Sequence, residues 1–275
     1  MSFMQQVGIL YNSELEKARD VAARLGESLS TLGISSWQCP AWEENKAKQQ
    51  VTGSDLLLSV GGDGTMLHAA HISAPANVPI LGINLGKLGF ITELSADEAV
   101  SKLPDLLKGA GWIEERAMLE ARLGDENFYA LNDVVVRSTS ARLINVKTEI
   151  NGGMLAIYRS DGVIIATATG STGYSLAAGG PILHPPSKEI ILQPISCHLG
   201  LNHTLVLPSQ SVVDLKVVAG DKGILSLDGQ VDISIYSEQN IRVKLSTYVA
   251  RFLKTHQPKY FYSSLRRKLR GKEQL

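Results

Sequence analysis

Short apolar runs alternate with helical patterns through about the first 115 residues of this 275-residue chain. The runs QVGILY, ISSWQC, DLLLSV and VPILGIN are typical of strands. The segment SELEKARDVAARLGESLSTLG has helical spacing and ends at Gly33, a residue suited to a helix C-cap. Near-continuous apolar strands that are separated by helices indicate a parallel sheet covered on both faces. The ligand crevice of such a sheet lies beyond the carboxyl ends of its strands, where the glycine-rich turns GGDG and GINLGKLGF are expected.

From about Leu119 the pattern changes to short strands bounded by Gly, Pro, Asp or Asn. The segment INVKTEINGGMLAIYRSDGVIIAT contains an Asn-Gly-Gly hairpin signal, and TLVLP, SVVDLKVV, GILSLDGQ, DISIYS and NIRVKLS read as further strands. We therefore predict an α/β domain over residues 1–115 and an all-β sandwich or layered β domain over 116–247. Helical spacing returns in 248–275, and we expect a C-terminal helix there that packs on the first domain.

Composition excludes several classes of protein. Lys+Arg and Asp+Glu both number 27, so the basic excess of a nucleic-acid-binding protein is absent. The basic tail SLRRKLRGK, which ends at Lys272, is either a solvated chain end or a contact for an anion or subunit. Two distant cysteines, Cys39 and Cys197, argue against structural zinc or a disulfide scaffold and suit a reducing compartment. Neither a signal-peptide pattern nor an apolar run of roughly 18 residues occurs, so we expect a soluble, cytoplasmic protein with no membrane partner.

The turn GGDG at 61–64 carries a carboxylate where a phosphate-binding loop would be expected to carry none. The P-loop pattern fails because its lysine and hydroxyl positions are missing, and the G-x-G-x-x-G spacing of a dinucleotide fingerprint fails as well. One interpretation is a plain strand-to-helix turn in which Asp63 or Thr65 caps the helix. The other is a ligand-binding turn that acts together with further motifs of the chain.

Three further motifs occur in the second half of the chain. The segment TGSTGYSLAAGGP at 169–181 combines glycines with small hydroxyl residues, which lets backbone and side-chain donors approach a ligand closely. ALNDVVV places Asn132 and Asp133 before a strand, and YRSDG places Arg159 and Asp161 on one side of an extended segment. Each has a plainer interpretation: a polar loop, an ordinary turn and a surface ion pair.

Together, GGDGT at 61–65, ND at 132–133 and TGSTGYSLAAGGP at 169–181 resemble the NAD kinase family, in order and through most of the chain. GGDG alone is shared with diacylglycerol and sphingoid lipid kinases. The resemblance implies an N-terminal Rossmann-like α/β domain, a C-terminal β-sandwich domain and a nucleotide bound between them. It also implies ATP-dependent phosphorylation of the 2′-hydroxyl of the adenosine ribose of NAD, with ATP as donor, Mg²⁺ or another divalent metal, and a homodimer or homotetramer.

Residue by residue, the resemblance makes Asp63 the catalytic base and assigns no protein ligands to a metal. It implies nucleotide contacts at Gly62, Asp63, Gly64, His68, Asn132, Asp133, Arg142, Arg159, Asp161, Thr172, Gly173, Tyr174, Ser175, Leu176, Ala177 and Gln230. Two positions depart from the family's usual pattern, which more often has Glu at 133 and Ala at 173. The match at Arg142 depends on an alignment that a shift of one residue would change.

Two other functions remain open from the residues alone. A lipid or sugar kinase would share GGDG and two domains, but it should lack the long motif at 169–181. A dinucleotide-sensing module without catalysis would bind NAD but would have no need of the carboxylate of Asp63.

Overall fold

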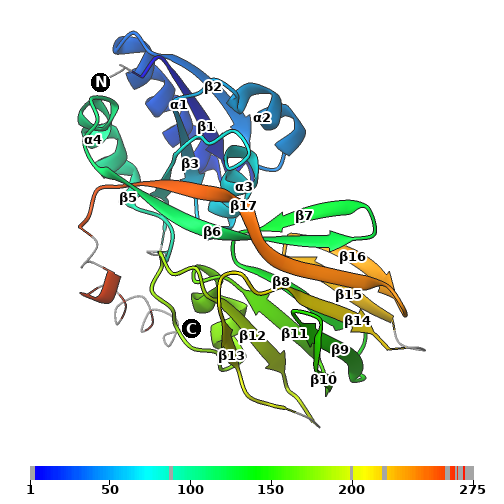
Figure 1. Cartoon of the computed structure of the whole chain (residues 1–275). Helices are drawn as coiled ribbons and strands as arrows, with labels where there is room; N and C mark the ends of the chain where they lie inside the picture. The colour runs from blue at the N-terminus through cyan, green and yellow to red at the C-terminus, as the bar shows by residue number, and fades with distance from the viewer. Residues whose placement is uncertain are drawn as a thin grey trace. The chain divides into compact units, whose positions relative to one another are not determined.

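The computed structural model describes residues 4–86, 89–198, 201–218 and 222–257, together with 261–263, 265 and 269. The chain divides into unit 1, Met1–Glu115 with Ala250–Leu275, and unit 2, Arg116–Val249. Each unit has its own buried core, and Figure 1 labels helices and strands of both units.

Unit 1 contains a parallel sheet in the spatial order β2-β1-β3-β4, with the end of β17 beside β4. Strand β3 is buried along its whole length, as the apolar run of its sequence predicts. The elements of this unit are β1 (Gln6–Tyr11), α1 (Glu16–Thr31), β2 (Ser35–Pro40), α2 (Glu44–Val51), β3 (Leu56–Gly61), α3 (Asp63–Ser73), β4 (Ile80–Asn84), β5 (Leu94–Ser95) and α4 (Ala96–Leu107).

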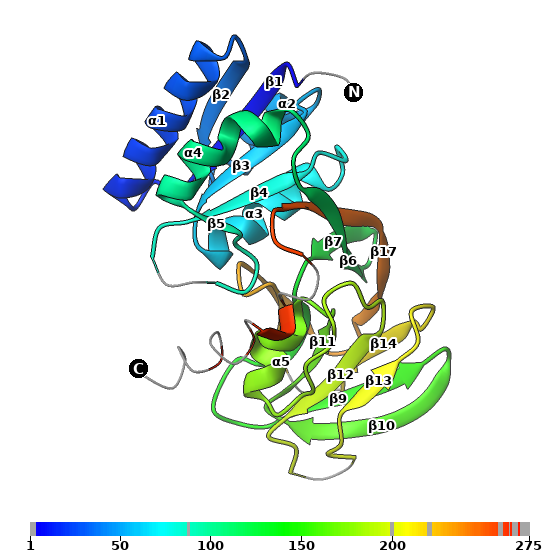
Figure 2. The ribbon, with the colours of Figure 1, turned by 90° about the vertical axis from the view of Figure 1, so that its left-hand side faces the viewer.

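Helices cover both faces of the unit 1 sheet (Figure 2). Leu81 and Ile83 of β4 belong to the apolar cluster that α1 and α4 cover. Side chains alternate along a strand, so Gly82 faces the opposite side. There a Cβ on Gly82 would lie 2.7 Å from Sδ of Met66, which places α3 on that second face. The predicted α/β domain with a parallel, doubly covered sheet is confirmed.

Two antiparallel sheets form unit 2. One has the order β10-β9-β14-β17, and the other has the order β13-β12-β11-β8-β15-β16. The elements are β6 (Trp112–Leu123), β7 (Glu126–Ala130), β8 (Asp133–Ser138), β9 (Ile144–Ile150), β10 (Gly153–Ser160), β11 (Gly162–Ala166), the 3₁₀ helix η1 (Gly170–Thr172), α5 (Tyr174–Ala177), β12 (Ile190–Ile195), β13 (Leu205–Leu207), β14 (Val213–Val217), β15 (Lys222–Leu227), β16 (Val231–Tyr236) and β17 (Asn240–Lys254).

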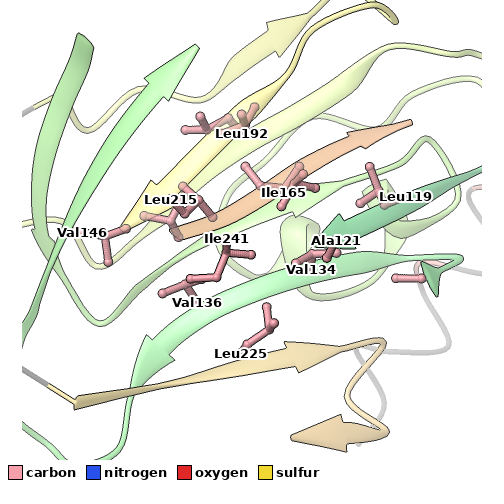
Figure 3. Close-up of a cluster of buried hydrophobic side chains, with 14 of the residues drawn as sticks. Leu119, Ala121, Val134, Val136, Val146, Ile165, Leu192, Leu215, Leu225 and Ile241 are labelled. Atoms are coloured by element: carbon pink, nitrogen blue, oxygen red, sulfur yellow. The ribbon is translucent and has the colours of Figure 1, made fainter. Parts of the chain in front are cut away.

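Apolar side chains from both sheets make one core in unit 2 (Figure 3). Val136 and Ile165 come from the second sheet, while Val146, Leu215 and Ile241 come from the first, and all five are buried. Side chains that meet from two packed sheets define a sandwich. The predicted β-sandwich is therefore confirmed.

The hairpin signal of the sequence is also borne out. Asn151 and Gly152 connect β9 to β10 and both have positive φ, at 51° and 78°. This is the requirement of a two-residue hairpin turn that matches strand twist, and Asn-Gly meets it with little strain.

The expectation of a helix over 248–275 is wrong for its first part. Residues 248–254 are the end of strand β17, in which Phe252 pairs with Ile80 of β4. Residues 255–257 are not helical, residues 261–263, 265 and 269 are helical as expected, and the rest of 258–275, with most of the basic tail, falls outside the described residues. No helix among the residues that the structure describes is long and apolar enough to cross a membrane.

Candidate functional site

The glycine turn after β3 becomes the start of helix α3. Gly61 closes the strand, where a Cβ would lie 2.9 Å from Cβ of Thr65, so packing against Thr65 requires glycine there. At Gly62 and Gly64 a Cβ would meet nothing within 4 Å. Gly62 is the N-cap of α3 and supplies no side-chain cap, and Asp63 is the first helical residue. This helix start is therefore not covered by its own side chains.

The carboxylate of Asp63 is held by the backbone of the second glycine-rich turn. Oδ2 accepts a hydrogen bond from the N–H of Phe90 at 2.8 Å, and Oδ1 accepts from Ile91 and Thr92 at 3.2 and 3.4 Å. The interpretation of Asp63 or Thr65 as a helix cap is thus wrong. A Cβ on Gly89 would come within 2.7 Å of Cγ of Asp63, so a larger residue there would displace the carboxylate or this segment. Sequence reasoning placed both turns at the same sheet edge, but it did not find Gly89 as the residue that makes their contact possible.

His68, one turn further along α3, is held by helix α2. Its Nδ1 lies 2.8 Å from Oε1 of Glu44, and its ring packs edge-on against Trp42 with centroids 4.3 Å apart. Glu44 also accepts a hydrogen bond from Lys48 at 2.9 Å. Burial favours the neutral form of Glu44, but the hydrogen bonds from His68 and Lys48 hold the pKa of its carboxyl at about 2. The His68 ring is therefore oriented by an ionised partner.

In unit 2, the Asn132–Asp133 turn is held from two sides. The carboxylate of Asp228 accepts hydrogen bonds from three successive backbone N–H groups, those of Leu131, Asn132 and Asp133, at 2.8, 2.7 and 3.0 Å. On the other side, Thr167 donates its hydroxyl to the carbonyl of Leu131 at 2.6 Å and its N–H to that of Asn132 at 2.9 Å. Asp228 was missed by sequence reasoning, although it lies two residues before the predicted contact residue Gln230.

The long motif at 169–181 packs directly on this turn. A Cβ on Gly170 would lie 2.9 Å from Cα of Asn132, and one on Gly173 would lie 3.9 Å from Oδ2 of Asp133. Gly170 lets η1 reach the Asn132–Asp133 turn, while the distance at Gly173 is an ordinary van der Waals contact. Two motifs that lie far apart in the sequence thus form one site within unit 2.

Within this motif the side chains differ in exposure. Thr172 is buried and donates its hydroxyl to the carbonyl of Thr169 at 3.1 Å. Ser175 is buried and lies against Gly180, whose N–H donates to its carbonyl at 2.8 Å. Tyr174 is 43% exposed, Leu176 is half-buried and Ala177 is exposed. Tyr174 is therefore the large side chain that this short helix presents outward.

A pocket of about 360 Å³ opens at this point of unit 2. Its lining is polar and includes three carboxylates, and it consists of Asn132, Asp133, Val135, Arg137, Tyr174, Ser226, Asp228, Gly229 and Asp232. Burial and the nearby charge of Asp228 raise the pKa of Asp133 to about 7. A carboxyl group with such a pKa can donate or accept a hydrogen bond near neutral pH, according to its protonation.

Four predicted contact residues of unit 2, Arg142, Arg159, Asp161 and Gln230, belong neither to the lining of this pocket, as the described residues define it, nor to the motif at 169–181. Arg142 is exposed in the connection before β9, and Arg159 and Asp161 are exposed around the end of β10. Arg159 and Asp161, both described, form no ion pair with each other, so the surface-pair interpretation fails. Gln230 closes the turn after β15, where its N–H donates to the carbonyl of Leu227 at 2.9 Å.

Among the described residues, no three His, Cys, Asp or Glu side chains gather closely enough to hold a metal ion.

Family models and known proteins match the chain over nearly its full length. A model described as the ATP-NAD kinase N-terminal domain matches residues 2–110, and one described as the ATP-NAD kinase C-terminal domain matches 131–255. An NAD kinase of Dehalococcoides mccartyi is 43% identical, with 97% of this chain and 96% of the relative covered. An NAD kinase of Chloroflexus aurantiacus is 35% identical, with 97% and 99% covered.

Solved structures show the same likeness. A yeast NADH kinase complexed with NADH has a TM-score of 0.86 at 25% identity, with 98% of this chain and 88% of that chain covered. An NAD kinase from Archaeoglobus fulgidus in complex with ATP has a TM-score of 0.78 at 26% identity, with 95% and 99% covered.

Proposed function

Because the chain belongs to the ATP-NAD kinase family, we propose that it transfers the γ-phosphoryl group of ATP to the 2′-hydroxyl of the adenosine ribose of NAD, giving NADP, with Asp63 as the general base. The observation that carries the role of Asp63 is its carboxylate, which three backbone N–H groups orient at the uncapped start of α3. A sensing module would have no need of a carboxylate oriented in this way.

In the proposed reaction, the 2′-oxygen of the ribose loses its proton and gains the phosphoryl group. A ribose hydroxyl is a weak nucleophile at neutral pH, and a carboxylate within hydrogen-bond reach orients it and accepts its proton. As the new oxygen–phosphorus bond forms, the bond between the γ-phosphorus and the ADP oxygen breaks. The proton is left on Asp63 and the negative charge on ADP.

Phosphate groups are proposed to lie near the start of α3. Backbone N–H groups at a helix N-terminus favour anions, and the absence of side chains at Gly62 and Gly64 lets phosphate oxygens approach closely. Mg²⁺ supplied with ATP would offset the negative charge that Asp63 adds near the phosphates.

The nucleotide contacts are proposed for the residues that the family resemblance marks. Asn132 and Asp133 can hydrogen-bond the adenine amino group and ribose hydroxyls, because amide and carboxylate oxygens accept from both. Small hydroxyl and backbone donors of the loop at 172–177 can approach the nucleotide closely. The remaining proposed contacts are His68, Arg142, Arg159, Asp161 and Gln230.

The test is NADP formation from NAD and MgATP by the wild type, Asp63→Asn and Asp63→Ala, with the NAD Kd measured by calorimetry. Both variants should lose about 10²- to 10⁴-fold in kcat and keep the wild-type Kd for NAD. NAD binding without NADP formation by the wild type would indicate a sensing module. A full rate in Asp63→Asn would place the base elsewhere.

We also propose that the protein acts in the cytoplasm as a homodimer or homotetramer with NAD and ATP as its small-molecule partners. The two free thiols of Cys39 and Cys197 suit a reducing compartment.

A further inference from the structure

We propose that Asp228 is a positioning residue of the nucleotide site, and that nucleotide binding beside the two buried neighbouring carboxyl groups, Asp133 and Asp228, releases a proton. The proposal rests on the assignment of Asn132 and Asp133 to the NAD site. It gives Asp228, which no motif of the sequence assigns, a defined part in that site.

The positioning part rests on hydrogen bonds. Asp228 is 9% exposed, and its two carboxylate oxygens take three successive N–H groups at 2.7–3.0 Å. Its own N–H donates to the carbonyl of Asp133 at 3.0 Å. The backbone of Asp228 is left-handed, with φ of 53°, a conformation that Asp and Asn tolerate better than most residues. A turn fixed by four hydrogen bonds to one residue loses its geometry when that residue changes.

The electrostatic part rests on the neighbours of Asp133 in the pocket. Asp133 is 5% exposed, and the titratable or charged groups around it are Asp228, Asp232, Arg137 and Tyr174. Arg137 pairs with Asp232 at 2.8 Å, so the cationic group of the pocket already has an acidic partner. Three backbone N–H groups donate to the carboxylate of Asp228, and Asp133 is the buried carboxyl group beside it. Burial and Asp228 raise its pKa to about 7.

The direction of the pH effect follows from the ligand. Ribose hydroxyls and an adenine amino group donate hydrogen bonds, so NAD prefers the ionised form of Asp133. Below pH 7 the protonated form predominates in the free protein, and ionising it opposes binding. The Kd for NAD should therefore rise about tenfold between pH 8.5 and pH 6, because one proton is released on binding.

The experiment measures the NAD Kd by calorimetry at pH 6, 7 and 8.5 in the full-length protein. Asp228→Asn removes the charge, keeps the shape and suits a left-handed backbone. At pH 8.5 its Kd should be several-fold weaker than that of the wild type, because hydrogen bonds to the turn are lost. Its ratio of Kd at pH 6 to Kd at pH 8.5 should fall from about tenfold to about twofold or less, because Asp133 titrates at lower pH without its charged neighbour.

A matched control is Asp214→Asn, in the same unit. Asp214 is 8% exposed and accepts hydrogen bonds from Arg242 and Asn240, both at 2.9 Å. This variant should lower the melting temperature and keep the tenfold pH dependence. Asp133→Asn should make the Kd for NAD independent of pH. This result would show that Asp133, and not a histidine elsewhere in the chain, is the group that titrates. Asp228→Ser serves as a second neutral variant if Asp228→Asn does not fold.

Retention of the wild-type pH ratio by folded Asp228→Asn or Asp228→Ser would overturn the inference, as would a wild-type Kd independent of pH. If the wild type still makes NADP in that case, only the role of Asp228 is lost. If the wild type binds no NAD at any pH, the proposed function fails first.

Discussion

The hydrogen atom that serves as the side chain of Gly89 decides where the carboxylate of Asp63 can lie. A methyl group there would sit 2.7 Å from Cγ of Asp63, so Gly89→Ala must push that carboxylate or the backbone of Phe90 aside. A misplacement of about 1 Å in a catalytic group can lower a rate about 10²-fold. We therefore expect Gly89→Ala to lower kcat by about that factor and to leave the NAD Kd unchanged. Steady-state kinetics combined with calorimetry measures both.

Gly86, in the same turn, provides the control for that substitution. A Cβ on Gly86 meets nothing within 4 Å, so Gly86→Ala should keep the wild-type kcat. Equal losses in both variants would show that the whole turn, and not the contact with Asp63, is sensitive to substitution.

At the scale of elements, one buried carboxylate of unit 1 binds the end of strand β17 and the two residues that follow it. Glu93, whose side chain is 7% exposed, accepts hydrogen bonds from Nζ of Lys254 at 2.7 Å and from the backbone N–H groups of Thr255 and His256 at 2.8 and 3.0 Å. Burial favours its neutral form, but the Lys254 ammonium and these donors lower the pKa of Glu93 from its ordinary 4.5 to about 2. Because the folded state lowers this pKa, the ionised carboxylate stabilises the protein above pH 4.5 and loses that effect as the pH falls toward 2.

Glu93→Gln should therefore lower the free energy of unfolding by about 3 kcal/mol at pH 7, with a smaller difference from the wild type at pH 3. Urea unfolding followed at both pH values measures this. Glu98→Gln is the control: the pKa of Glu98 is also about 2, but its side chain is 48% exposed and glutamine can still complete its capping box with Ser95. Its cost should stay below about 1 kcal/mol. A similar loss in both variants would mean that burial of Glu93 contributes little.

At the scale of the whole molecule, the family resemblance implies a homodimer or homotetramer. Light scattering after size-exclusion chromatography should then give two or four times the chain mass of 29.7 kDa. On unit 2, Met154 and Ile157 of β10 are about half exposed, and strand β10 ends its sheet. Exposed apolar side chains on an edge strand are typical of surfaces that pair with another chain. A mass of one chain across micromolar concentrations would contradict this expectation.

The sequence alone determined the features that depend on local spacing. The apolar runs of β1, β3 and β4, the helical spacing of α1 and the Asn151–Gly152 turn all fold as their patterns predict, because periodicity and backbone preference act within a few residues. The motifs around Asp63 and Asn132 could be singled out for the same reason, since glycines and small polar residues limit what a short segment can do.

Only the tertiary structure decided which distant segments meet. Residues 248–254 have helical spacing but form a strand. The reason is that Phe252 pairs with the backbone of β4, more than 160 residues away in the sequence. Likewise, Asp228 reaches Leu131, Asn132 and Asp133 across 95 to 97 residues, and Asp63 reaches Phe90 across 27. Such contacts leave no period in the sequence, because a buried carboxylate needs only donors that the fold brings to it, and those donors are backbone groups that every residue but proline carries.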